Sequence, residues 1–189
     1  ALSSAASDVY KRQACSYAKV DYSNFMNITA RTALKLIPDP LKTHPVFLCV
    51  DDTMVSKSGK KFENVSKLFN HAAHNGSNYL NGHCFVSIML CVPVLDHDKI
   101  SYLSVPLGYG YRMWQKKESK LELAASMIRQ VMPEFLSKEH VIILCDSWYT
   151  KKNLVSIIDE YPNLDLIGNA RIDSVMYDLA PERTGRRGR

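Results

Sequence analysis

Two short apolar runs that each end in aspartate constrain the fold of this chain more than any other feature of its sequence. Residues 45–52 read PVFLCVDD, and residues 140–146 read HVIILCD. Runs of this length, rich in β-branched and other apolar residues, are typical of strands buried inside a sheet. The sequence therefore predicts two interior strands whose C-terminal ends carry Asp51, Asp52 and Asp146.

Three further segments have the pattern of strands. Residues 82–93 form a long apolar run, residues 99–107 (KISYLSVPL) alternate, and residues 164–168 read LDLIG. A turn is expected over residues 95–98 (LDHD), between the first two of these segments. Because the connections are short, the first three strands of the chain are expected to form an antiparallel meander.

The apolar period changes from strand to helix after the third predicted strand. Between Lys117 and Met132, apolar residues recur at i, i+3, i+4 and i+7, and a proline follows the last turn. Residues 151–160 and 29–36 are also expected to be helical. The order of three strands, a helix, a strand, a helix and a strand predicts an α/β fold. It is the order of an RNase H-like mixed sheet flanked by helices.

The composition is that of one soluble globular domain. The chain has 189 residues, of which 46% are hydrophobic and 23% charged, which excludes disordered and low-complexity classes. No apolar run approaches the roughly 20 residues that cross a bilayer, and no signal segment opens the chain.

The net charge of +5 is a mild indication of polyanion binding. Five cysteines without a CxxC pair favour free thiols over a disulfide frame or a zinc site.

The two ends of the chain are expected to lie outside the fold. Residues 1–13 resemble a translated sequencing adapter and are set aside from functional reasoning, the alternative being a genuine flexible N-terminus. Residues 14–44 are interpreted as a helical or irregular lead-in, and residues 45–182 as the main domain, itself incomplete. Residues 183–189, which include Arg186 and Arg187, read as a basic linker at which the chain is truncated.

The aspartates at the ends of the interior strands suggest a metal site. If these strands are neighbours, the carboxylates of Asp146 and of Asp51 or Asp52 meet at one edge of the sheet. Converging carboxylates need a cation between them, and their oxygens suit Mg²⁺ or Mn²⁺. Two such ions can support phosphodiester cleavage or strand transfer. The alternative is that these acids are ordinary turn or cap residues, and alternation along a strand lets only one of Asp51 and Asp52 face a metal.

Three segments, in this order, resemble the DDE-type transposases of bacterial insertion sequences. They are Cys49-Val-Asp-Asp-Thr53 followed by Lys57 and Gly59, Gly82-His-Cys-Phe-Val86, and Ile143-Leu-Cys-Asp-Ser-Trp-Tyr149. The similarity spans roughly residues 25 to 189. It implies an RNase H-like DDE catalytic core that cuts DNA and performs strand transfer with a two-metal site of Mg²⁺ or Mn²⁺.

The resemblance also assigns site residues. The first catalytic, metal-binding aspartate falls on Asp52, with Asp51 as the adjacent candidate, and the second falls on Asp146. The third acid of the family, a glutamate on a helix after the last strand, has no match in this chain. The acids beyond Leu166 lie in no strong helical pattern; they are Asp173, Asp178 and Glu182. We therefore expect the chain to be inactive on its own.

DNA is the expected partner, in the form of terminal inverted repeats and target DNA. The candidate DNA-binding residues are Lys57, Lys60, Lys61, Trp148, Tyr149, Arg186 and Arg187. The basic side chains would contact phosphates and the aromatic rings would stack on an unpaired base, although solvated charges and rings packed beneath a loop are the alternatives.

The resemblance further implies a transposase homodimer in the bacterial cytoplasm, associated with the nucleoid when bound to DNA. Two other functions stay open at this point. One is an RNase H-like nuclease or resolvase without strand transfer, and the other is a catalytically dead DNA-binding remnant.

Overall fold

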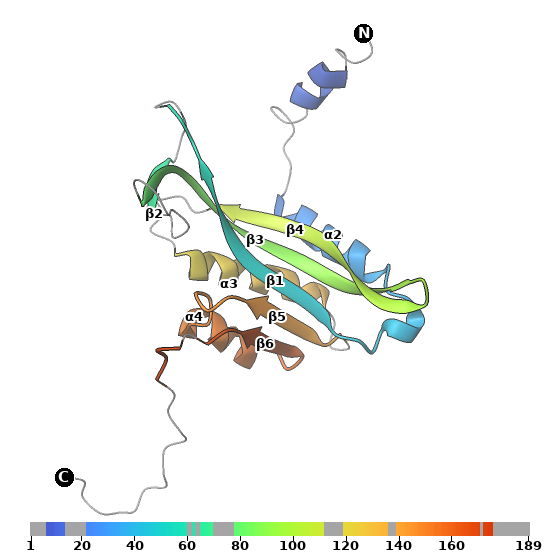
Figure 1. The fold of residues 1–189 in the computed structure, drawn as a ribbon. Helices are drawn as coiled ribbons and strands as arrows, with labels where there is room; N and C mark the ends of the chain where they lie inside the picture. The colour runs from blue at the N-terminus through green and yellow to red at the C-terminus, as the bar shows by residue number, and fades with distance from the viewer. Residues whose placement is uncertain are drawn as a thin grey trace, which may run out of the picture.

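One mixed sheet of six strands forms the centre of the molecule (Figure 1). The computed structural model describes residues 7–13, 22–59, 62, 65–69, 78–111, 119–135, 139–170 and 172–175. The strand order is β2-β3-β1-β5-β6, and β4 pairs with β3. The strands are β1 (Val46–Ser56), β2 (Ser66–Phe69), β3 (Tyr79–Asp96), β4 (Lys99–Tyr111), β5 (Val141–Cys145) and β6 (Leu164–Gly168).

The antiparallel half of the sheet is built around β3, the longest strand. On one edge β3 pairs with β1, from Phe47↔Cys91 to Ser56↔Gly82, and on the other edge it pairs with β2 and then β4. His97 and Asp98 connect β3 to β4 with φ values of 47° and 61°. Two consecutive residues with positive φ match the right-handed twist of a tight hairpin. The turn expected over residues 95–98 and the antiparallel pairing of the three strands are confirmed.

The parallel half of the sheet places the two aspartate-bearing strands side by side. β1 pairs with β5 from Val46↔Val141 to Val50↔Cys145, and β5 pairs in parallel with β6. Parallel neighbours need crossover connections, and helices supply them on the way into both β5 and β6. The α/β fold class is therefore confirmed, with a mixed sheet in the RNase H-like order.

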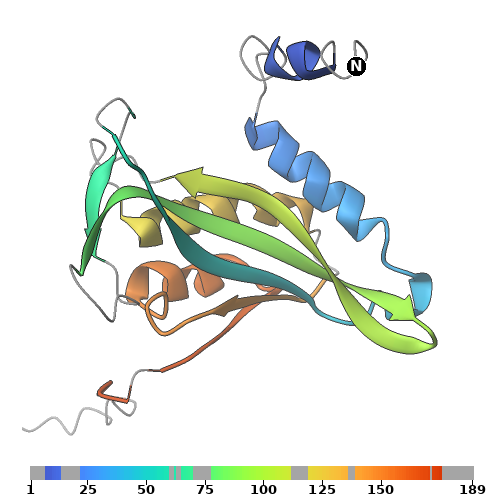
Figure 2. The ribbon, with the colours of Figure 1, turned by 45° about the horizontal axis from the view of Figure 1, so that its top comes forward.

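The helices pack against one face of the sheet (Figure 2). They are α2 (Tyr22–Leu34), α3 (Lys120–Val131), α4 (Lys152–Val155) and the 3₁₀ segments η1 (Asp39–Leu41), η3 (Met132–Glu134) and η4 (Ser156–Glu160). In β1 the buried residues are Val46, Leu48 and Val50, which alternate with less buried neighbours. They share one core with the apolar stripe of α3, including Ala124 and Ile128. The helical periodicity of this stripe is thus confirmed.

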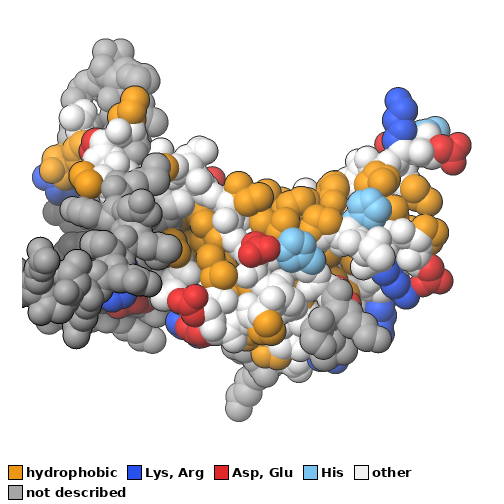
Figure 3. Space-filling view, turned by 90° about the horizontal axis from the view of Figure 1, so that it is seen from below, with side chains coloured by type: hydrophobic (Ala, Val, Ile, Leu, Met, Phe, Trp, Pro, Cys, Tyr) orange, Lys and Arg blue, Asp and Glu red, His pale blue; other side chains and the backbone are white. Residues whose placement is uncertain are grey.

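The opposite face of the sheet carries no helix among the described residues. Large apolar side chains remain exposed on this face, among them Met89 on β3 and Ile167 on β6, at 40% and 59% exposure. Figure 3, which views the molecule from below, shows hydrophobic side chains gathered along the concave upper outline of the molecule.

The start of α3 is fixed by a capping box. The Ser119 hydroxyl accepts from the Glu122 N–H at 3.1 Å, and the Glu122 carboxylate accepts from the Ser119 N–H at 2.7 Å. Such reciprocal bonds satisfy two backbone donors that a helix end leaves free. Lys120 is therefore held as the first residue of α3. Lys117, where the helix was expected to begin, lies outside the described residues.

Several elements differ from the sequence-based expectation, among them α2, which begins at Tyr22 and ends at Leu34. β1 runs on to Ser56, so Asp51 and Asp52 lie inside the strand and not at its tip. The reason is pairing with β3: at Gly82 a side chain would overlap the Val55 carbonyl oxygen, and glycine lets the two strands approach. β2 was not expected, since only four polar and apolar residues alternate there. The helix expected over residues 151–160 is one turn of α-helix, α4, followed by the 3₁₀ segment η4.

Within the described residues, no helix is both long enough and apolar enough to cross a membrane. The four cysteines that the structure describes, Cys49, Cys84, Cys91 and Cys145, are free thiols, as expected.

Candidate active site

Asp52 and Asp51 point to opposite faces of the sheet. Asp52 follows the alternation of Leu48 and Val50 towards the helices, and its side chain is 16% exposed. Asp51 is exposed, and its Oδ1 accepts the Asp52 N–H at 2.8 Å. Strand alternation therefore gives only Asp52 a partly enclosed environment on the helix face.

Three side chains from different parts of the fold contact the Asp52 carboxylate. The Lys120 ammonium lies 2.7 Å from Oδ2, and the Tyr149 hydroxyl donates to Oδ1 at 3.1 Å. The Cys84 thiol is 3.5 Å from Oδ2. These residues come from the first turn of α3, the segment after β5 and the middle of β3. The carboxylate is thus oriented by groups that only the tertiary structure brings together.

Tyr149 is fully buried beneath the loop that follows β5. Its side chain has no exposed surface, and its ring meets the Trp148 ring edge to face at 5.2 Å between centroids. Burial raises the pKa of the phenol well above its ordinary value, and the nearby Asp52 carboxylate raises the pKa further. The hydroxyl consequently stays protonated and donates to Asp52. Of the two interpretations offered for Tyr149, stacking on a base and packing beneath the loop, its burial agrees with packing beneath the loop.

Asp146 lies immediately after β5 and is exposed. Its Oδ1 accepts the backbone N–H groups of Trp148 at 3.0 Å and of Tyr149 at 3.3 Å. These bonds form a turn of the kind that aspartate favours. Tyr149 therefore contacts both acids, Asp146 through its backbone and Asp52 through its hydroxyl, which places the two predicted aspartates on either side of one residue.

Two lysines lie against the Trp148 ring. The Lys120 ammonium is 4.6 Å and the Lys151 ammonium 4.3 Å from the ring centroid. Both distances suit cation–π attraction. Trp148 is half-buried and Lys151 is exposed, so two ammonium groups, one of them also bound to Asp52, lie beside this ring.

The carboxylates of Asp52 and Asp146 suit a divalent cation, since carboxylate oxygens are the ligands that Mg²⁺ and Mn²⁺ prefer. The Lys120 ammonium stands where such a cation would bind Oδ2. Within the described parts of the chain, no three or more His, Cys, Asp and Glu side chains converge as metal ligands. Asp173 lies in a turn, and Asp178 and Glu182 are outside the described residues. Among the described residues, Asp52 and Asp146 thus both contact Tyr149, and no third acid joins them.

The other predicted DNA contacts are scattered or undescribed. Lys57 follows the end of β1 and lies 5.4 Å from the centroid of the Phe62 ring. Four further candidates, Lys60, Lys61, Arg186 and Arg187, lie outside the described residues.

Sequence reasoning missed Lys120, Lys151 and Cys84 as residues of the site. A lysine at the first position of a helix was a usable signal for Lys120, because the helix dipole disfavours positive charge there.

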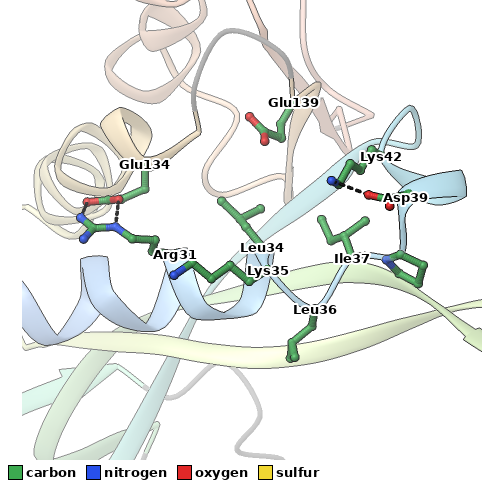
Figure 4. A pocket seen from close by; sticks show the side chains of 10 residues that line it. Arg31, Leu34, Lys35, Leu36, Ile37, Asp39, Lys42, Glu134 and Glu139 are labelled. Atoms are coloured by element: carbon green, nitrogen blue, oxygen red, sulfur yellow. Dashed lines mark hydrogen bonds and ion pairs between the residues drawn. The ribbon is translucent and has the colours of Figure 1, made fainter.

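A separate cavity of about 630 Å³ lies between α2, η1 and η3 (Figure 4). Two ion pairs line it, Arg31 with Glu134 at 2.9 Å and Lys42 with Asp39 at 2.6 Å. Its lining shares no residue with the Asp52 cluster.

The chain belongs to a family described as DDE superfamily endonuclease, whose model matches residues 14–189. The predicted resemblance to DDE-type proteins is thereby confirmed. No curated protein matches the chain. A likeness to one solved structure, a cryo-EM synaptic complex of piggyBac transposase with hairpin DNA, has a TM-score of 0.42 and 14% identity. It covers 68% of this chain and 23% of that one, so the chain spans about a quarter of that transposase.

Proposed function

We propose that this chain is the catalytic core of a transposase that cleaves DNA and joins the resulting 3′ end to a target. The family supports an endonuclease. The observation that carries the proposal is the parallel register of β1 and β5, through which Tyr149 contacts both Asp52 and Asp146. Two acids on neighbouring strands of a mixed sheet suit phosphodiester chemistry.

In this proposal Asp52 and Asp146 hold Mg²⁺ or Mn²⁺. The bound ions would activate the attacking oxygen and stabilise the leaving oxygen. Asp52 is favoured over Asp51 because it faces the same enclosed environment as Tyr149 and Lys120. Tyr149 orients the Asp52 carboxylate through its buried hydroxyl, and Asp146 fixes the loop that carries Tyr149 and Trp148.

Substrate DNA would approach the exposed side of this site. Lys151 is exposed beside Trp148, and basic residues attract phosphates without regard to sequence. Terminal inverted repeats and target DNA are the proposed substrates, bound by a homodimer. The proposal also includes a third carboxylate supplied from outside the two-acid cluster, without which the chain does not cleave DNA.

Metal binding is the direct test of the site. We would titrate Mn²⁺ into the full chain by calorimetry and compare it with Asp52→Asn, Asp146→Asn, Asp51→Asn and the control Asp159→Asn, an exposed acid of η4. Asp52→Asn and Asp146→Asn should each weaken Mn²⁺ binding at least tenfold, since each removes a hard anionic ligand. Asp51→Asn and Asp159→Asn should leave it within twofold. Equal binding by all five proteins would contradict the proposal.

The catalytically dead, DNA-binding remnant is the second candidate. The lack of a three-acid cluster among the described residues favours it. Binding of a DNA duplex that is unaffected by Mn²⁺ and by Asp52→Asn, together with no Mn²⁺ binding, would support the remnant. Mn²⁺ binding that depends on both aspartates would support the nuclease.

A further inference from the structure

We infer that the Lys120 ammonium is a tethered counter-ion of Asp52 that a divalent ion must displace in order to bind. The inference deepens the proposed function and rests on it, because it concerns the same carboxylate. It gives Lys120 the role of holding and compensating the Asp52 carboxylate when no metal is bound, which the family match does not describe.

Both oxygens of Asp52 already have partners. Oδ1 accepts the Tyr149 hydroxyl and Oδ2 lies 2.7 Å from the Lys120 ammonium. Each carboxylate oxygen has two lone pairs, and at Oδ2 the ammonium shares them with the Cys84 thiol, 3.5 Å away. A metal ion that binds Oδ2 therefore needs the position that one of these two donors holds, and only the ammonium carries a charge that repels the ion. Two positive charges also repel each other at such short range. One donor therefore has to move away when a cation arrives.

Lys120 is the donor that can leave. Tyr149 is fully buried, and its ring is packed against Trp148 and the core, so its hydroxyl cannot swing aside. The Lys120 side chain is 20% exposed and has a flexible four-carbon stem. A second resting place is at hand, because its ammonium is already 4.6 Å from the centre of the Trp148 ring. Movement of Lys120 towards this ring would clear Oδ2 without disturbing the backbone.

The position of Lys120 in α3 indicates that the pair with Asp52 is its main stabilising contact. A positive charge in the first turn of a helix is opposed by the helix dipole. Ser119 and Glu122 already satisfy the cap, so Lys120 adds nothing to it. Its ammonium instead reaches a residue 68 positions earlier in the chain. Without metal, this pair keeps the partly buried Asp52 charge compensated.

The competition has a measurable consequence. Because the ammonium and the metal ion bind the same oxygen, the ion pair weakens metal affinity by the same factor by which metal weakens the ion pair. Lys120→Met keeps the length of the side chain and removes its charge. We expect this variant to bind Mn²⁺ about tenfold more tightly than the parent, as judged from the typical strength of a partly buried ion pair.

The experiment is calorimetric titration of Mn²⁺ into the full chain, with the thermal unfolding midpoint as a second readout. Lys151→Met is the matched control, since it removes a lysine charge beside the same Trp148 ring without touching Asp52. It should change Mn²⁺ affinity less than threefold. Lys120→Arg retains the charge and should bind Mn²⁺ no more tightly than the parent. Added Mn²⁺ should raise the unfolding midpoint more in Lys120→Met than in the parent.

The outcomes separate this inference from the proposed function. If Asp52→Asn weakens Mn²⁺ binding but Lys120→Met leaves it unchanged or weaker, the inference is overturned while the metal site stands. An equal gain in Lys120→Met and Lys151→Met would also overturn it, because the effect would then be general electrostatics. A gain in Lys120→Met that survives Asp52→Asn would place the metal elsewhere and would overturn both. Should Lys120→Met unfold, Lys120→Arg binding Mn²⁺ tenfold more tightly would refute the inference, and binding at or below the parent would support it.

Discussion

The hydroxyl of Tyr149 is the most informative single group to remove. Tyr149→Phe deletes one oxygen from a ring with no exposed surface and leaves the 5.2 Å edge-to-face contact with Trp148 in place. The ring volume hardly changes, so no cavity of consequence forms. The loss is therefore that of the 3.1 Å hydrogen bond to Asp52.

The size of the loss follows from the acceptor. A hydrogen bond to a charged group contributes about 1.5 to 3 kcal/mol. We expect the lower end of that range, because Asp52 keeps Lys120 on its other oxygen and retains some exposure to water. A loss of about 1.5 kcal/mol in the free energy of unfolding lowers the melting temperature of a domain of this size by about 3 to 6 °C.

Urea denaturation followed by circular dichroism measures this loss, with an unchanged m-value as the sign that only stability has altered. Tyr102→Phe is the matched control, since the hydroxyl of Tyr102 donates to a neutral carbonyl, that of Pro45, at 3.3 Å from a partly exposed position. Its loss should be well below that of Tyr149→Phe. Equal losses in the two variants, or a Tyr149→Phe protein as stable as the parent, would refute the reasoning. So would an undiminished effect of Tyr149→Phe in an Asp52→Asn background.

Three further predictions concern the frame around the site. Gly82→Ala should unfold at markedly lower urea concentration or fail to fold, because its methyl group would overlap backbone of β1, whereas Gly108→Ala meets only ordinary contacts and should be far milder. Ser119→Ala should lose about 1 kcal/mol of stability in the same assay, through the lost helix cap. Burial and the neighbouring Cys91 raise the pKa of the Cys49 thiol to about 11, so its neutral form stabilises the fold fully below the ordinary thiol pKa. That contribution should disappear as the pH rises towards 11, and Cys49→Ala should unfold with a weaker dependence on alkaline pH.

Each of these predictions has a contradicting result. Gly82→Ala that is no less stable than Gly108→Ala would mean that the two strands can separate at no cost. Ser119→Ala with unchanged stability would show that water replaces the cap. An alkaline unfolding curve that is identical with and without Cys49 would place the titrating group elsewhere.

The local patterns of the sequence were sufficient for most of the elements. The apolar runs of β1 and β5, the period of α3 and the segment of β6 are each encoded by neighbouring residues, so they could be identified without the fold. The order of these elements also restricted the topology, because parallel strands need crossovers and short connections favour antiparallel pairs. The adjacency of β1 and β5 followed from that order. By contrast, β2 and the extension of β1 to Ser56 depend on hydrogen bonds to β3, which no local pattern reports.

The sequence by itself determined that the two aspartate-bearing strands are neighbours, and the tertiary structure decided what surrounds each aspartate. Strand alternation showed that Asp51 and Asp52 must point apart, but only the packing of the helices on one face made Asp52 the enclosed one. Lys120 and Tyr149 reach Asp52 from 68 and 97 positions away in the chain. Contacts over such separations depend on how α3 and the loop after β5 sit on the sheet. Tyr149 shows the same limit: its residue type is compatible with stacking on a base or with packing beneath a loop, and only the tertiary structure buries the ring and brings its hydroxyl to Asp52.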